Sequence, residues 1–196
     1  MTDDMMPLKK DNRPLAIALA VAAAACLLFA CFTQKWLVNT QLEIGFGLRS
    51  NEVCGGPDSC QSRSNSSLVS ELQEAEGNSD NASGAFAPMG WVTFGVLIAA
   101  ALGLLAAAGL AVAKKKPNLP MAPTTLALLG LMISLITGCV FVATKPGPAG
   151  YIGVGLSFWL FGAGAVIGIA AAQMLAKINR PEDPDLMADA MQPDQF

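Results

Sequence analysis

Four long runs of hydrophobic residues divide the chain and alternate with polar segments. Each run has at least 18 residues and contains no charged side chain. A helix that spans the hydrocarbon core of a bilayer needs about 20 apolar residues, and its backbone groups must bond within the helix. The pattern therefore predicts four transmembrane helices, over residues 14–33, 88–113, 122–143 and 151–176.

The basic residues fall mainly on one side of this predicted topology. Eight of the twelve lysines and arginines belong to residues 1–13, 114–121 and 177–196, and four belong to residues 34–87 and 144–150. Segments rich in Lys and Arg beside a membrane span tend to stay in the cytoplasm. We therefore expect a multi-pass protein of the cell membrane with two cytoplasmic tails, of which the C-terminal one is acidic, and a cytoplasmic loop between the second and third spans. Residues 34–87 then form an outer loop, and residues 144–150 form an outer turn.

The outer loop opens with a strand-like alternation. Over residues 38–49, the mostly apolar residues occupy even positions, and polar residues or glycines occupy the odd ones. A period of two predicts a β-strand with one apolar face. Leu42, Ile44 and Phe46 belong to that face, which either covers a small core or acts as an interaction face for a partner.

Two cysteines, Cys54 and Cys60, flank a Gly-Gly-Pro-Asp-Ser turn in the same loop. The turn predicts partner strands around the two cysteines, and the later SSLVSELQEAEG sequence predicts a short helix. Cysteines outside the cytoplasm usually pair, so we expect a disulfide that staples the loop and stabilises it by about 2–3 kcal/mol. A redox-active pair is the alternative. The predicted fold is an all-α membrane protein, a four-transmembrane-helix bundle with a small extracellular or periplasmic β unit in the first outer loop.

Five residues of this loop follow one another in a distinctive order, a tryptophan, a Gly-Leu pair and two cysteines: Trp36, Gly47, Leu48, Cys54 and Cys60. In order and in topology the chain resembles the claudin and peripheral myelin protein superfamily, except that Arg49 stands where the family has tryptophan. The resemblance implies a left-handed four-helix bundle under a small extracellular sheet, which Trp36, Gly47 and Leu48 would seat on the bundle. It also implies a role in lateral assembly, adhesion or barrier formation, or as an accessory subunit of channels.

Small residues are frequent in the predicted spans, and four glycines stand out as candidates for helix packing: Gly103, Gly109, Gly164 and Gly168. Glycines three or four residues apart let helix backbones approach closely. Packing among the four spans and a lateral face for another protein both need such residues, so both alternatives stay open. Trp159 lies well inside the fourth span, and we expect it to pack against a neighbouring helix.

The composition narrows the function. The chain is 53% hydrophobic and 14% charged, and it contains no histidine. Ionisable groups within the spans, which mark transport paths, are missing, and so is a basic patch interleaved with aromatic residues for nucleic acid. We expect no catalytic residue, cofactor, metal site or small-molecule substrate. The expected partners are the lipid bilayer and other membrane proteins or copies of the chain itself. The predicted function is that of a non-enzymatic integral membrane protein, acting through its outer loop and helix faces as a scaffold, an adhesion or barrier component, or an accessory subunit of a membrane complex.

Two other functions are weighed against this one. In a membrane thiol–disulfide oxidoreductase, Cys31 and Cys139 near the outer ends of their spans would exchange electrons with Cys54 and Cys60, although no Cys-x-x-Cys motif is present. In a lipoprotein, the sequence LLFAC, which resembles a lipobox, would be cleaved before Cys31 to leave a lipid-anchored protein.

Overall fold

Four long apolar helices dominate the fold. The structure, a computed structural model, describes residues 12–39, 43–54, 59–76, 83–114, 121–146 and 152–179, without the side chains of residues 75 and 76. Four of its helices are long and apolar enough to cross a membrane, as the hydrophobic runs predict: α1 (Arg13–Phe32), α3 (Phe86–Ala113), α4 (Pro123–Ala143) and α5 (Leu156–Ile178). The largest difference from the predicted spans is at α5, which begins at Leu156 because Gly153–Val154 form a strand.

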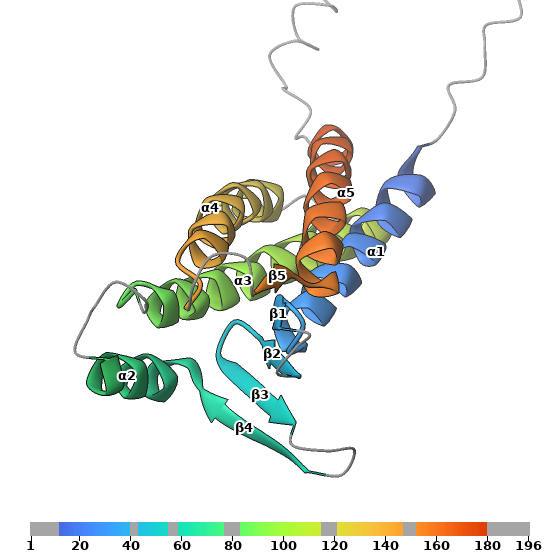
Figure 1. Ribbon diagram of the computed structural model, residues 1–196. Coiled ribbons are helices and arrows are strands. Elements are labelled where there is room, and N and C mark those ends of the chain that lie inside the picture. Colours follow the sequence, from blue (N-terminus) through green and yellow to red (C-terminus); the bar gives the residue numbers. More distant parts are fainter. Residues whose placement is uncertain are drawn as a thin grey trace, which may run out of the picture.

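The small antiparallel sheet lies at one end of the helix bundle. The first residue of α1 and the last residue of α5 lie at the opposite end (Figure 1). α3 packs against α1 and α4, and α5 packs against α1. The end that carries the sheet, where α1 ends and α3 and α5 begin, is called the sheet end of the bundle below.

The outward surface of the bundle is apolar. Ile136 is 65% exposed, Trp159 is 67% exposed and Val166 is 70% exposed. A water-soluble protein rarely exposes so much contiguous apolar surface, so this surface fits an apolar solvent. The expectation that Trp159 packs against a neighbouring helix is wrong: its side chain points away from the bundle, and Ser157 and Phe161 occupy the buried face of α5 instead.

Three of the four candidate glycines bring helices together within the chain. A Cβ on Gly103 would lie 3.0 Å from the carbonyl oxygen of Pro123, and one on Gly164 would lie 3.1 Å from the Cβ of Cys26. A Cβ on Gly168 would lie 3.1 Å from Leu131. Gly109 does not do so, because a Cβ there would meet no described atom within 4 Å, and its role in a lateral face for another protein stays a prediction.

The sheet has five short antiparallel strands in the order β4-β3-β2-β1-β5. These strands are β1 (Leu37–Asn39), β2 (Ile44–Phe46), β3 (Ser50–Cys54), β4 (Cys60–Ser64) and β5 (Gly153–Val154). The strand β5 comes from the segment between α4 and α5 and was not predicted. The predicted short helix is present as α2 (Asn65–Glu76), beside the β3–β4 hairpin (Figure 1).

The prediction of one continuous strand over residues 38–49 is wrong. The segment folds back on itself, so that β1 and β2 pair with each other and Val38 lies opposite Gly45. Glu43, before β2, has a φ of 53°, a left-handed conformation that a continuous strand does not contain. The reversal places Leu37 opposite Phe46, so an odd and an even position share the buried face.

Candidate interaction site at the sheet end of the bundle

Trp36 connects the start of the sheet to three helices. Its side chain is fully buried, with ring centroids 5.1 Å from Phe161 and 6.0 Å from both Phe141 and Phe158. Its indole Nε1–H donates a hydrogen bond of 2.5 Å to the carbonyl oxygen of Ala30. That carbonyl lies in the last turn of α1, where no further backbone N–H is in helical position to reach it. The tryptophan therefore fills the space between α4 and α5 and completes the C-terminal end of α1.

The turn between β2 and β3 is inserted between helices α2 and α3. Leu48 is buried, and its carbonyl oxygen lies so close to Gly90 of α3 that a Cβ on that glycine would overlap it. A Cβ on Gly47 would overlap the side chain of Gln34. Asn65, the first residue of α2, holds the turn from the other side, where its Nδ2 donates to the carbonyl oxygen of Gly47 at 2.9 Å. Trp36, Gly47 and Leu48 thus all lie where the sheet meets the helices.

Two of the three residues considered for an interaction face or a core face, Ile44 and Phe46, are described by the structure, and neither is fully exposed. Phe46 is 4% exposed and meets Phe86 edge to face at a centroid distance of 6.2 Å, so it belongs to the core. Ile44 is partly buried and packs against the same core. Leu42 lies outside the described residues. Of the two roles considered for this face, the structure places Phe46 in the core role.

The longest exposed strand of the sheet belongs to the β3–β4 hairpin. Cys54 and Cys60 lie opposite each other in the two strands and form the predicted disulfide. All five residues of β4 are exposed, and this strand is an edge of the sheet. The sequence of β4, Cys-Gln-Ser-Arg-Ser, is polar throughout. The hairpin therefore presents a polar, covalently closed surface that is held at its base by the buried turn.

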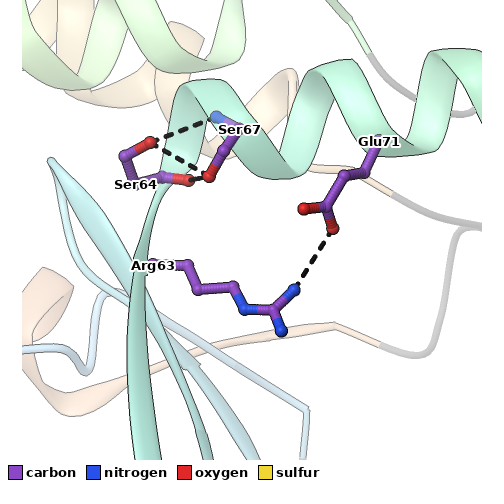
Figure 2. Close-up of polar contacts among 4 residues, drawn as sticks. All are labelled: Arg63, Ser64, Ser67 and Glu71. Carbon is purple, nitrogen blue, oxygen red and sulfur yellow. Dashed lines mark hydrogen bonds and ion pairs between the residues drawn. The ribbon is translucent and has the colours of Figure 1, made fainter.

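Helix α2 is fixed to the hairpin by polar contacts (Figure 2). The hydroxyl of Ser64 accepts a hydrogen bond of 3.1 Å from the backbone N–H of Ser67, as an N-cap residue does. The guanidinium of Arg63 lies 3.3 Å from the carboxylate of Glu71. Both side chains are more than half exposed, so this ion pair orients α2 more than it stabilises the fold.

Removal of either cysteine of the disulfide should destabilise the hairpin by the same amount. We expect Cys54→Ser and Cys60→Ser each to lower the free energy of unfolding by about 2 kcal/mol, because each removes the same short cross-link. The measurement is thermal unfolding of the purified protein in detergent without reductant, with Cys139→Ser, which removes an exposed free thiol on α4, as the control. A large difference between the two single variants would show that the pair is more than a staple.

Arg49 makes contacts that the sequence did not reveal. Its guanidinium carbon lies 4.3 Å from the ring centroid of Phe94, 5.7 Å from that of Trp91 and 5.9 Å from that of Phe32. The rings come from the end of α1 and the first part of α3, and the arginine comes from the β2–β3 turn. The only signal in the sequence was the arginine itself, at the position where the resembling family has tryptophan.

The remaining cysteines do not join the disulfide. Cys31 is buried near the end of α1, whereas Cys139 is exposed on α4, and both are free. One group of potential metal ligands is found among the described residues, Glu52 with Cys54 and Cys60, whose ligand atoms lie within 4.8 Å of one another. Both sulfurs of this group are bonded to each other, so they offer no thiolate to a metal in this state.

The comparisons with known proteins give no family for this chain. No model of a known protein family matches it, and a search of curated proteins finds no match either.

Proposed function

We propose that this chain is a non-enzymatic membrane protein that presents its β3–β4 hairpin and α2 to partner proteins outside the cytoplasm. In this proposal α1, α3, α4 and α5 cross the cell membrane, and both termini lie in the cytoplasm. The protein acts as a scaffold, as an adhesion or barrier component, or as an accessory subunit of a larger membrane complex. Lateral contacts with its own copies belong to the same class of role.

The observation that carries the proposal is the contrast between the buried β2–β3 turn and the exposed β3–β4 hairpin. The β2–β3 turn is buried between α2 and α3, and Trp36 anchors β1 in the bundle. The β3–β4 hairpin, in contrast, is exposed along the whole of β4 and closed by a disulfide. A surface that is held rigid and left uncovered loses little conformational entropy when it binds a partner. This arrangement suits recognition.

Two further observations support the orientation and the number of spans. In the sequence, eight of the twelve lysines and arginines belong to residues 1–13, 114–121 and 177–196, the segments that this proposal puts in the cytoplasm, as the positive-inside rule favours. Helix α1 supplies a row of buried alanines to the core, including Ala16, Ala20 and Ala23. Cleavage before Cys31 would remove those contacts, which favours a protein that keeps α1 as a span.

The test is site-specific photocrosslinking in native membranes. A photoreactive amino acid at Ser62, exposed in the middle of β4, should give a crosslinked product of discrete mass, whether the partner is another protein or a second copy. The matched control places the same amino acid at Ala113, which is exposed at the opposite end of the bundle. Mass spectrometry identifies the product and reports the state of Cys54 and Cys60.

Either of two results would contradict the proposal. The first is that Ser62 gives no discrete product, or the same products as Ala113, in membranes where the protein is correctly inserted. The second is a mixture of thiol and disulfide at Cys54 and Cys60 together with a bound quinone in the gently purified protein. This second result would favour the thiol–disulfide oxidoreductase.

A further inference from the structure

Arg49 is held at a fixed place by its backbone. Its carbonyl oxygen accepts a hydrogen bond of 3.0 Å from the backbone N–H of Asn65, and the carbonyl of the preceding Leu48 is lodged against Gly90. The guanidinium therefore extends from a rigid turn. Its carbon lies 4.3 Å from the ring centroid of Phe94, within the range of a cation–π interaction.

The hydrogen-bond donors of this guanidinium are not used within the described part of the protein. No described residue accepts a hydrogen bond from the side chain of Arg49, and the ion pair found among those residues joins Arg63 to Glu71 instead. Contacts with aromatic rings satisfy the charge but not the five N–H groups. A guanidinium with free donors is suited to bind a planar or tetrahedral oxyanion, which it can contact with two parallel hydrogen bonds.

The aromatic residues around Arg49 place it at the boundary between water and lipid. Phe32 is 60% exposed and Trp91 is 54% exposed, both on the outward surface of spanning helices. Helix α3 has 28 residues, so upright it measures about 42 Å and would extend about 6 Å beyond each side of a hydrocarbon core of about 30 Å. Trp91 then lies about 7.5 Å from the start of the helix, at the edge of that core, where tryptophan is enriched.

We propose that Arg49, on its platform of Phe32, Trp91 and Phe94, binds the phosphodiester group of a glycerophospholipid in the leaflet next to the sheet. The guanidinium donates to the phosphate oxygens, and the exposed faces of Phe32 and Trp91 contact the first part of the acyl chains. The site lies at the base of the sheet, so a bound lipid also fixes the height of the β3–β4 hairpin above the membrane. The inference rests on the proposed insertion of the helices in a membrane but not on the proposed partner-binding role.

Four additives distinguish a lipid site from a general anion site or from lipid contact alone. The full-length protein is purified in an uncharged detergent, and its bound lipids and thermal unfolding are followed by native mass spectrometry and circular dichroism. Phosphatidylglycerol is compared with a diacylglycerol that has the same chains, with glycerol 3-phosphate and with inorganic phosphate. We expect phosphatidylglycerol to bind and to raise the unfolding temperature, and the other three to do neither at the same concentration.

Variants then assign the binding to the arginine. Arg49→Gln should weaken the binding of phosphatidylglycerol about tenfold or more, since it removes a charge-assisted, two-bond contact. Arg49→Lys keeps the charge but loses the two parallel N–H donors of the guanidinium, so its affinity should lie between those of the wild type and Arg49→Gln. Arg63→Gln, on the exposed hairpin, is the control and should bind phosphatidylglycerol like the wild type.

Each of three outcomes would overturn the proposal. Equal protection by the diacylglycerol would show that the phosphate is not recognised, and equal protection by glycerol 3-phosphate or inorganic phosphate would show a general anion site. Unchanged binding in Arg49→Gln would show that another residue holds the lipid. The first two comparisons use only the wild-type protein, so they decide the matter even where Arg49→Gln fails to fold.

Discussion

Replacing Trp36 with alanine is expected to lower the free energy of unfolding by about 3–5 kcal/mol, the range for large aromatic residues in protein cores. The side chain is fully buried and lies within 5.1–6.0 Å, centroid to centroid, of three phenylalanine rings from α4 and α5. Its loss would leave a cavity where β1 joins three helices, and it would also leave the carbonyl oxygen of Ala30 without the indole donor. The sheet and the bundle would therefore be destabilised together.

Two further tryptophan variants separate packing from hydrogen bonding. Trp36→Phe keeps an aromatic ring but loses the N–H donor. The carbonyl oxygen of Ala30 keeps a longer hydrogen bond of 3.4 Å from the hydroxyl of Thr33, so the substitution should cost about 0.5–1.5 kcal/mol, the net contribution of one hydrogen bond. Trp159→Ala removes the same side chain from an outward position that is 67% exposed, and should change stability by less than about 1 kcal/mol. Unfolding in sodium dodecyl sulfate, followed by circular dichroism, measures all three. Equal losses for Trp36→Ala and Trp159→Ala would contradict the central role of Trp36.

Replacing Gly90 with alanine should separate the β2–β3 turn from α3. A Cβ at this position would overlap the carbonyl oxygen of Leu48 and lie 3.0 Å from its carbonyl carbon and 3.1 Å from a ring carbon of Phe141. Backbone cannot give way as a flexible side chain does, so we expect a loss of about 2–3 kcal/mol in spite of the better helix propensity of alanine.

Gly109→Ala is the matched control on the same helix and should have the opposite sign. No described atom lies within 4 Å of the Cβ that it would add, so the substitution should stabilise α3 by about 0.5–1 kcal/mol through helix propensity alone. Thermal unfolding gives the two signs. Hydrogen exchange at the amides of Gly47 and Asn65 adds a local readout, because it should accelerate in Gly90→Ala only. Similar effects of the two substitutions would show that close contact with Leu48 is unimportant.

The positions of the four long helices followed from the sequence, but the faces that they bury did not. A run of about 20 apolar residues has few structures available in lipid, so its length alone predicts a helix. The orientation of each helix about its axis is set by its neighbours. Gly103 and Gly109 are six residues apart, which places them about 120° apart around a helix of 3.6 residues per turn. Only Gly103 can then face α4, and a run that is hydrophobic all round carries no signal to distinguish them.

Only the part of the sheet that depends on neighbouring residues was predictable, because the pairing of strands that are distant in the sequence leaves no local pattern. The two cysteines and the turn between them gave the β3–β4 hairpin and its disulfide correctly. The alternation over residues 38–49 concealed a reversal of the chain before β2, since one residue with positive φ leaves hardly any trace in a hydrophobic pattern. The two-residue strand β5 depends on pairing with β1, which no local sequence encodes.

The contacts of Arg49 show the same limit at a candidate binding site. Its aromatic platform combines Phe32, near the end of α1, with Trp91 and Phe94 of α3, and each of the three alone is an ordinary residue near the end of a span. The predicted topology puts all four residues toward the outer side of the membrane. Their convergence depends on how the turn is inserted between α2 and α3, which required the structure.

Because β1 pairs with β5, the sheet can finish folding only after the segment between α4 and α5 has been synthesised. Leu37 pairs with Val154, so the ribosome must add about 115 residues after β1 before its partner exists, which takes roughly 6–23 s at ordinary elongation rates. During that interval the backbone of β1 has an open edge, of the kind that invites wrong pairing. The sheet is therefore closed only when β5, which leads into α5, has paired with β1. A nascent chain whose last helix fails to reach its place would keep that edge open, where a chaperone or protease can bind it.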